Sequence, residues 1–406
     1  MTAYPWPLGR LNHLLEQARA RPFYGARLTG LPPSIESLDQ WRNIPLLNKH
    51  ELQGEGQNGV ATVFDRPRTD YVRFHQTSGT TGHPMVVLDT QDDWSWWLDC
   101  WDKVLDAAEV KSNDVAMMAF SFGPFIGFWT AAEAMTRRGI LTIPGGGLSS
   151  VARARMIVEQ QCTVVCLTPT YGLHLIEVAK EHGLNLRGSR VRCLIVAGEP
   201  GGSVPSVRKL LEDGFGSSVI DHVGASEIGA WGYGNEQGSG IFVNEDEFFA
   251  ELISVQNQSP LDVTSQHTSE GELVLTSLGR LGGPVIRYRT GDLVNAEKTQ
   301  DGRLFLHGGV IGRIDDMMTI RGVNIFPSSI EAIVRELFSE AEFRIHRSRR
   351  GQMDQLHVEV EGTSQQAETL QSELSVRLAI RTQVDSVAKG SLPRFEAKAR
   401  RVIDDS

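Results

Sequence analysis

Hydrophobic positions between residues 70 and 200 alternate between two spacings. Short apolar runs, typical of buried strands, alternate with longer segments in which apolar residues recur at helical spacing. The predicted strands are 71–75, 85–88, 114–120, 139–143, 163–167 and 191–196. The predicted helices are 90–109, 129–138, 150–160 and 169–182. This alternation predicts an α/β fold, in which a mostly parallel sheet carries helices on its faces.

The flanking regions have a different texture. A helix is predicted over 11–21 and a further strand over 218–221. Beyond residue 240 the chain is more polar, and an antiparallel or barrel-like element is predicted from the short strand candidates 272–277, 285–289 and 304–306. An amphipathic helix follows over 328–338, and we expect Ser328 or Ser329 to cap it.

The predicted helix 90–109 carries four tryptophans, at positions 94, 96, 97 and 101. Thr90 is suited to cap this helix, with Asp92 and Asp93 in its first turn, where a helix favours negative charge. We expect the tryptophans to pack the helix onto the sheet rather than to bind a ligand.

The composition is that of an ordinary globular protein, with 40% hydrophobic and 22% charged residues in a chain of 406. The net charge of −10 argues against nonspecific nucleic-acid binding, which needs a basic face. No apolar run approaches the roughly 18–20 residues of a membrane span, and the first residues lack a secretory signal pattern. We therefore expect a cytoplasmic protein with no nucleic-acid or membrane partner.

Four cysteines are too few to suggest a disulfide framework in a chain of this length. Cys162 and Cys166 lie in a β-branched run, and we expect both thiols to point to one face of a strand and to be buried. No further ligands for a zinc site stand nearby in the sequence.

Residues 77–84, Thr-Ser-Gly-Thr-Thr-Gly-His-Pro, join two predicted strands as a hairpin loop. Hydroxyls and glycines fill the first six positions, so the segment disfavours a helix and suits a tight loop whose N–H groups and hydroxyls converge on an anion. It is not a Walker loop, because no lysine follows Gly82. The alternative interpretation is a solvated turn.

Three further motifs carry candidate chemistry. Ala197–Pro200 follows a predicted strand, and a glycine at such a strand end lets a flat ring approach the backbone. Glu227 lies in the glycine-rich segment 222–229, where it suits either a helix cap or a Mg²⁺ ligand. Asp292 ends the run Arg-Tyr-Arg-Thr-Gly-Asp, and its carboxylate suits two ribose hydroxyls unless the run is only a surface turn with an ion pair.

Together with the segment 312–327 and the basic run 393–403, these motifs in this order resemble the core motifs of the adenylate-forming superfamily of acyl-CoA synthetases, peptide adenylation domains and luciferases. The resemblance extends from about residue 22 to 403 and is greatest to the phenylacetate–CoA ligase group. It implies an N-terminal AMP-binding domain over 1–314 and a mobile α+β C-terminal domain over 315–406. It also implies that the N-terminal domain combines mostly parallel sheets, flanking helices and a small barrel-like element.

The resemblance also implies a role for each motif in nucleotide binding. The β- and γ-phosphates of ATP are expected to be held by Thr77, Ser78, Gly79, Thr80, Thr81 and Gly82. The adenine is expected to be lined by Gly198, Glu199 and Pro200. Glu227 is expected to bind Mg²⁺, Asp292 to hold the ribose, and Arg313 to contact the ribose or a phosphate.

The same resemblance places the moving parts in the last hundred residues. Asp315 is expected to be the hinge, and Gly322 to lie along the path of the thiol donor. Lys398 is expected to be the catalytic lysine that reaches the carboxylate and the α-phosphate. It lies in the basic run that ends an otherwise acidic protein.

The sequence departs from the family pattern at several places, and three of them lie in or beside the candidate motifs. His83 stands where the family usually has lysine, so the loop carries less positive charge. Val223 replaces the aromatic residue that stacks on adenine, and that role is expected to be lost or to move to His222. The cysteine that the related ligases carry shortly after this motif is absent from residues 235–237.

The acid pocket is expected around the turn 121–128. Its candidate residues are Ser121, Phe122, Phe125, Phe128, Tyr171, Gly224 and Ala225, with His174 as a further polar contact. Three phenylalanines among small residues suggest a flat apolar slot, which suits an aryl acid better than a long acyl chain. Each phenylalanine is equally well explained as plain core.

The leading functional hypothesis is an aryl-CoA ligase that uses ATP, Mg²⁺ and CoA and forms an acyl-adenylate before the thioester. The runner-up loads an aryl acid onto the phosphopantetheine arm of an acyl or peptidyl carrier protein in secondary metabolism. A third hypothesis is a nucleotide-binding regulator without catalysis, against which Glu227, Asp292 and Lys398 argue. The sequence leaves open whether the protein forms a homodimer.

Overall fold

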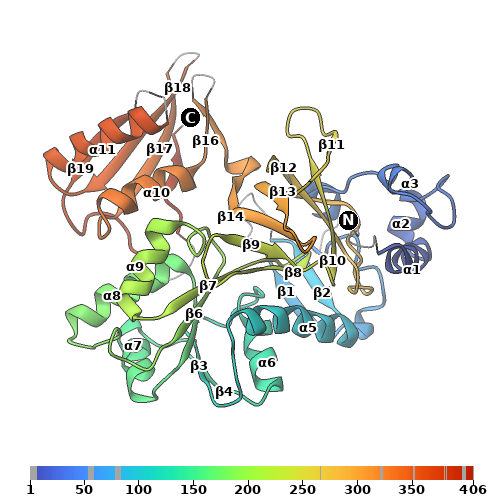
Figure 1. The fold of residues 1–406 in the computed structure, drawn as a ribbon, viewed down its shortest axis with the longest axis horizontal. Coiled ribbons are helices and arrows are strands. Elements are labelled where there is room, and N and C mark those ends of the chain that lie inside the picture. Colours follow the sequence, from blue (N-terminus) through green and yellow to red (C-terminus); the bar gives the residue numbers. More distant parts are fainter. Residues whose placement is uncertain are drawn as a thin grey trace.

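The computed structural model describes residues 7–53, 59–77, 84–265, 267–320, 323–350, 353–378, 380, 382–395 and 399–405. In this part of the chain, one sheet of 12 strands forms the body of the molecule, with strand order β11-β10-β12-β13-β14-β9-β8-β7-β6-β5-β3-β4. The C-terminal elements form a separate unit that stands over the helices α8 and α9 (Figure 1).

One half of this sheet is parallel, and both of its faces are covered by helices. Its strands are β3 (Val115–Met118), β4 (Leu141–Pro144), β5 (Val164–Leu167), β6 (Cys193–Ala197) and β7 (Ser218–Ala225). Its connecting helices are α6 (Trp129–Arg137), α7 (Ser150–Glu159), α8 (Pro169–Glu181) and α9 (Pro205–Phe215). Successive residues of β5 contribute to different hydrophobic clusters on the two faces, so the predicted α/β architecture is confirmed.

The other half is antiparallel. Its strands are β8 (Gly229–Gly234), β9 (Gly240–Val243), β10 (Phe248–Ile253), β11 (Pro260–Leu261), β12 (Ser269–Ser277), β13 (Tyr288–Lys298) and β14 (Leu304–Arg313). These strands, expected as a barrel-like element, continue the parallel half as one sheet. The strand predicted over 285–289 begins only at Tyr288, because Arg287 adopts a φ of +51° and breaks the extended conformation.

The N-terminal region packs around the antiparallel half. It contains α1 (Leu8–Arg19), α2 (Pro22–Arg27), α3 (Leu38–Arg42), α4 (Lys49–Gln53) and the 3₁₀ turn η1 (Arg68–Asp70). The hairpin of β1 (Arg73–Gln76) and β2 (Val86–Asp89) follows, and it is antiparallel as predicted.

Helix α5 (Gln91–Ala107) lies after the hairpin, with Thr90 as its N-cap in a full capping box with Asp93. All four of its tryptophans are buried, which confirms that they pack the helix onto the body of the protein.

The prediction for the cysteines was half right. All four thiols are buried, but Cys162 precedes β5 and packs in one hydrophobic cluster while Cys166 packs in the other, on the opposite face. The strand's two-residue period starts only at Val164, so it does not extend back to Cys162.

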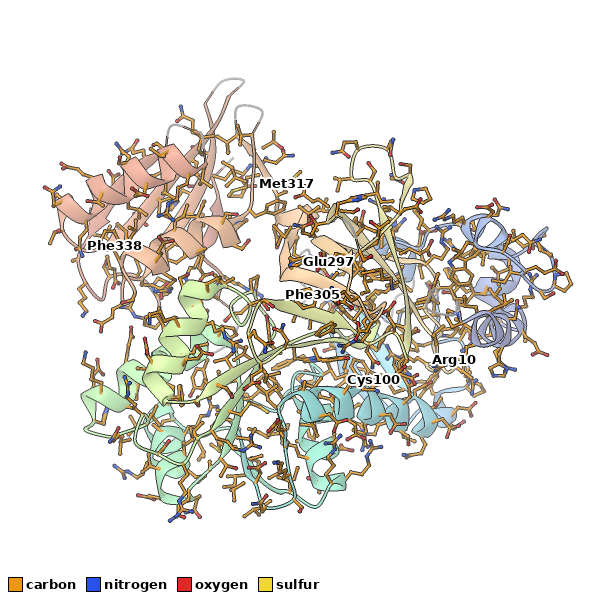
Figure 2. All side chains as sticks on the ribbon, in the orientation of Figure 1. Arg10, Cys100, Glu297, Phe305, Met317 and Phe338 are labelled. Atoms are coloured by element: carbon orange, nitrogen blue, oxygen red, sulfur yellow. The ribbon has the colours of Figure 1, made fainter. Side chains whose placement is uncertain are left out.

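The C-terminal unit begins after the 3₁₀ turn η2 (Ile314–Asp316), and Met317 marks the passage into it (Figure 2). Its elements are β15 (Met318–Ile320), β16 (Val323–Ile325), α10 (Pro327–Leu337), β17 (Phe343–Arg350), β18 (Met353–Glu361), α11 (Ser364–Arg377), β19 (Gln383–Val387) and β20 (Val402–Asp404). The order of its main sheet is β19-β18-β17-β20. Its hydrophobic cluster contains only residues from Met318 onward, so this unit has a core of its own.

The cap predicted for α10 was wrong. The N-cap is Phe326, with Pro327 in the first turn, and no side chain caps the helix. Ser328 instead donates a hydrogen bond to the carbonyl of Ile311, which joins α10 to β14. The fixed φ of Pro327 suits the first helical position without a polar cap.

None of the helices in the described part of the chain combines the length and the apolar character that crossing a membrane requires.

Candidate active site

The hairpin β1–β2 closes just before the predicted phosphate loop. Gln76 pairs with Val86, the Thr77 amide donates to the Met85 carbonyl over 2.9 Å, and the Met85 amide donates to Thr77 Oγ1 over 3.0 Å. Thr77 therefore lies at the base of the predicted loop, where the paired strands end. The remaining predicted phosphate-binding residues, Ser78 to Gly82, lie outside the described residues, as does His83.

Glu227 lies in the turn between β7 and β8 and is 9% exposed. The hydroxyl of Tyr288, itself buried at the start of β13, donates to Glu227 Oε1 over 2.9 Å. Burial and the adjacent Glu227 charge raise the pKa of Tyr288 far above its usual value, so the hydroxyl keeps its proton. The carboxylate is therefore held in one orientation by a donor from a different strand.

The backbone of the same turn is held from behind by Arg280. Its Nη1 donates to the carbonyl oxygens of Ser226 and Glu227 over 3.0 and 2.9 Å. Its Nη2 lies 2.6 Å from Asp89 Oδ1, and neither side chain of this pair is exposed to solvent. The turn that carries Glu227 is thus connected through a buried ion pair to the end of β2.

Asp292 and Arg313 face each other across β13 and β14, where the sheet register pairs them directly. Arg313 Nη1 lies 3.2 Å from Asp292 Oδ1, and its Nε and Nη2 donate to the two oxygens of Asp315 over 2.9 and 3.0 Å. Burial raises the pKa of Asp292 to about 6, although Arg313 acts against the shift. Burial also acts to raise the pKa of Asp315, but the paired hydrogen bonds from Arg313 outweigh it and lower that pKa.

The two arginines of the run 287–292, Arg287 and Arg289, have structural roles. Arg287 is buried and binds Glu251 and the carbonyl oxygens of Arg42 and Ile44. Arg289 binds Glu272 on the neighbouring strand β12. Both are satisfied within the protein, so Asp292 is the residue of the motif whose carboxylate lies with Arg313.

Gly198 follows β6 with a φ of +96°, a conformation that glycine adopts without strain. The sheet register pairs the preceding Ala197 with His222 on β7, so the two predicted adenine-binding segments are neighbours. The carboxylate of Glu199 accepts from the Thr170 amide over 2.7 Å and from the Ala399 amide over 3.0 Å.

His222 is buried, and its Nδ1 lies 2.8 Å from the Gly232 carbonyl oxygen, which only accepts hydrogen bonds. Burial lowers the pKa of His222 to about 4, so at neutral pH the ring is uncharged, with the proton on Nδ1. The ring packs against Trp101 at a centroid distance of 4.4 Å. One side of the His222 ring is therefore covered by Trp101.

The predicted phenylalanine turn forms a ring cluster around Phe120, which the sequence interpretation had left in the preceding strand. Phe120 makes edge contacts with Phe122, Phe125 and Phe128 at centroid distances of 6.2, 5.5 and 5.3 Å. Phe128 is buried against Trp101, whereas Phe125 is 38% exposed. Because Trp101 contacts both Phe128 and His222, the ring cluster adjoins the adenine-side residues.

The remaining pocket candidates fall into two groups: Ser121 and Tyr171, which both contact Arg153, and Gly224 with Ala225 at the end of β7. Tyr171 is fully buried in the second hydrophobic cluster, and its hydroxyl donates to Ser150 over 3.1 Å. Ser121 is exposed, 3.4 Å from Arg153 Nη2. Gly224 and Ala225 end β7, and a Cβ at Gly224 would lie 2.9 Å from the Gly229 carbonyl oxygen. The close approach of β8 therefore explains the glycine.

Gly322 and Lys398 lie outside the described residues. The sequence interpretation also passed over Tyr288, Arg280, Asp89 and Phe120. For Tyr288 the signal was present, because it stands inside the motif that ends at Asp292, but only the fold shows that it contacts Glu227.

Comparison with known proteins adds a family assignment to this geometry. The family model for AMP-binding enzymes matches residues 6–245, and that for the AMP-binding enzyme C-terminal domain matches residues 322–406. The phenylacetate-coenzyme A ligase of Escherichia coli (strain K12) is 32% identical over 389 residues, covering 92% of this chain and 87% of that protein. The enzyme of the same name from Pseudomonas putida is 30% identical over 391 residues, covering 92% and 86%.

Among solved structures, 2-hydroxyisobutyryl-CoA ligase in its postadenylation state aligns with a TM-score of 0.89 at 30% identity, covering 98% of this chain and 88% of that chain. The same ligase in its thioesterification state, with CoA bound, aligns with a TM-score of only 0.72 at the same identity and coverage. Since the sequence compared is the same, the difference lies in how the parts are arranged. This chain has the arrangement closer to the postadenylation state.

Proposed function

This chain belongs to the AMP-binding enzyme family as an AMP-forming acid–CoA ligase, and we propose that the acid it activates is an aryl carboxylate related to phenylacetate, benzoate or anthranilate. The observation that carries this proposal is the ring cluster around Phe120, which adjoins the nucleotide side through Trp101. Edge-to-face aromatic contacts offer an aryl ring a well-packed apolar partner.

The first half-reaction requires two anions to meet, the carboxylate of the acid and the α-phosphate of ATP. The phosphate-loop residues from Thr77 to Gly82 supply N–H and hydroxyl donors in this proposal, and Lys398 supplies a positive charge. Asp292 accepts from the ribose hydroxyls, with Arg313 holding it in place. Gly198 and Pro200 line the adenine beside the uncharged His222.

The site also fits a magnesium ion. Glu227 offers a single hard carboxylate, and the hydroxyl of Tyr288 orients it. This is the pattern expected for Mg²⁺, which usually takes one or two protein carboxylates together with phosphate oxygens and water. When bound, Mg²⁺ neutralises phosphate charge; Glu227 is the residue that would hold it.

The second half-reaction transfers the acyl group to the thiol of CoA. We assign residues 1–314 to an AMP-binding domain and 315–406 to a mobile domain, with Asp315 as the hinge and Gly322 on the thiol path. The separate core that begins at Met318 supports this division. Arg313 pairs with Asp315 as well as with Asp292, so the ribose side of the site is connected to the hinge.

The test is ATP- and acid-dependent pyrophosphate release with a panel of phenylacetate, benzoates, anthranilates and fatty acids, with and without CoA. Turnover that depends on an aryl acid and is accelerated by CoA is the expected result. Turnover with fatty acids alone would overturn the aryl assignment, and aryl-dependent release that CoA does not accelerate would identify a carrier protein as the acceptor. Lys398→Ala is expected to abolish adenylation while sparing thioester formation from a supplied acyl-adenylate.

A further inference from the structure

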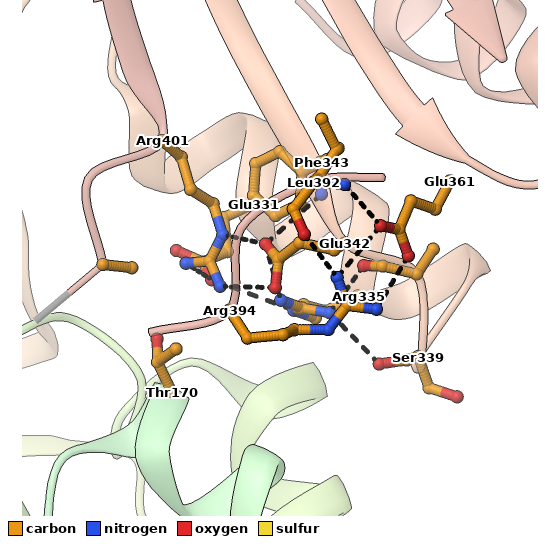
Figure 3. A network of polar contacts seen from close by, with 12 residues as sticks. Thr170, Glu331, Arg335, Ser339, Glu342, Phe343, Glu361, Leu392, Arg394 and Arg401 are labelled. Atoms are coloured by element: carbon orange, nitrogen blue, oxygen red, sulfur yellow. Dashed lines mark hydrogen bonds and ion pairs between the residues drawn. The ribbon is translucent and has the colours of Figure 1, made fainter. Parts of the chain in front are cut away.

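The segment that contains Lys398 is anchored on both sides within the C-terminal unit (Figure 3). Before it, Arg394 binds Glu361 through two hydrogen bonds of 3.0 and 2.7 Å. After it, the Arg401 guanidinium binds Glu342 and also donates to Glu331 over 3.0 Å. The described residues on both sides of Lys398 are therefore bound to the same C-terminal unit.

These anchors are buried, which makes them strong. Arg401, Glu342 and Glu361 are each less than a tenth exposed. Burial acts to raise the pKa of Glu361, but the hydrogen bonds from Arg394 outweigh it and lower that pKa to about 2. A buried ion pair with several hydrogen bonds is costly to break. We therefore expect Arg394 and Arg401, on the two sides of Lys398, to move together with the C-terminal unit.

One carboxylate connects this segment to the N-terminal part of the chain. Glu199 Oε1 accepts from the Thr170 amide, and its Oε2 accepts from the amide of Ala399, the residue directly after Lys398. Thr170 lies in the first turn of α8, where amides have no partner within the helix and a negative charge is favoured. Of the two bonds to Glu199, the one from Thr170 anchors it at α8 and the one from Ala399 spans the two units.

We propose that Glu199 is a positioning residue, a latch that holds the Lys398 segment against the nucleotide side during adenylation and releases it for the thiol step. This role rests on the proposed catalytic function of Lys398. It is compatible with adenine lining, because the latch uses the carboxylate while Gly198 and Pro200 supply backbone. The arrangement fits the higher similarity to a postadenylation structure than to a thioesterification structure.

An ion pair between Lys180 and Glu340 also spans the two units on this side, and it is exposed to solvent. Lys180 Nζ and Glu340 Oε1 are 3.4 Å apart, with side chains 78% and 63% exposed. Exposed pairs of this kind contribute little. The pair is more useful as a reporter, because it marks two accessible positions that lie close together in this arrangement.

The first test compares the two half-reactions in Glu199→Ala and Glu199→Gln, with phenylacetate as the probe acid. Glu199→Ala removes both hydrogen bonds and is expected to lower the ratio of adenylation rate to thioester-forming rate by about 10- to 100-fold, the usual range for hydrogen bonds to a charged group. Glu199→Gln keeps one acceptor oxygen and is expected to fall between. A raised KM for ATP with both half-reactions lowered equally would show that Glu199 acts through nucleotide binding, and the latch would be wrong.

The second test needs no substrate, so it separates the latch from the proposed function. The Lys180→Cys and Glu340→Cys double variant is cross-linked with a short bismaleimide, which the four buried native cysteines do not disturb. The cross-link yield is expected to fall at least threefold when Glu199→Ala is added, and to stay unchanged with Glu181→Gln, an exposed glutamate at the end of α8. A yield for Glu199→Ala equal to that of the Glu181→Gln control would overturn the proposal, whatever the turnover.

Discussion

Replacing Tyr288 with phenylalanine removes a single oxygen from the candidate metal site. The ring stays in its buried place at the start of β13, because the substitution keeps its shape. What is lost is the hydrogen bond of 2.9 Å to Glu227 Oε1. The Glu227 carboxylate, 9% exposed, then has little water to replace the missing donor.

The magnitude follows from that environment. A hydrogen bond to a charged group contributes about 1.5–3 kcal/mol, and the upper part of the range applies where the group is mostly buried. If the bond serves to orient the carboxylate for Mg²⁺, its loss weakens the apparent affinity for Mg²⁺ by about 10- to 100-fold, since every 1.4 kcal/mol is tenfold.

The assay is a Mg²⁺ titration of acid-dependent ATP–pyrophosphate exchange, with thermal unfolding measured on the same samples. The matched control is Tyr24→Phe, which also removes a buried hydroxyl, one that donates to the Pro284 carbonyl over 3.0 Å. We expect both variants to lose some stability and only Tyr288→Phe to need more Mg²⁺. Identical Mg²⁺ curves for wild type and Tyr288→Phe would refute the reasoning.

Three further predictions follow from the same region. Because the pKa of Asp292 is raised to about 6, its contribution to stability is fully present below the unfolded value near 4 and is lost as pH rises through 6. Its contact with the ribose needs the charged carboxylate, so kcat/KM for ATP should fall as pH drops below about 6. Arg313→Gln should shift this fall in kcat/KM to higher pH. Arg280→Met leaves the buried Asp89 charge without its partner and should lower the free energy of unfolding by about 3–5 kcal/mol. The denaturation midpoint should fall accordingly, and adding Asp89→Asn should partly restore it; an unchanged midpoint would contradict this. Asp315→Pro should stiffen the hinge so that adenylation persists while thioester formation falls, with Asp315→Asn as the flexible control, and equal rates for both half-reactions would show that the pivot lies elsewhere.

The sequence predicted the parts of the site that depend on local order. The hairpin that carries Thr77, the cap at Thr90 and the alternating strands and helices all follow from spacing within short windows, and the structure confirms them. Prediction from local order failed where one backbone angle or one contact with a distant residue decided the structure. Arg287 delays β13 by its left-handed conformation, and Ser328 contacts β14 instead of capping α10.

By itself, then, the sequence determined which residues form each element and which motifs stand together, because a strand or helix period is a property of neighbouring residues. Only the tertiary structure decided the contacts between residues far apart. Tyr288 reaches Glu227 across 61 positions, and Glu199 reaches Ala399 across 200. Such pairs depend on strand register and on how the two units pack, and neither leaves a periodic trace in the chain. The motifs therefore identify the chemistry, while the fold identifies which side chains hold those motifs in place.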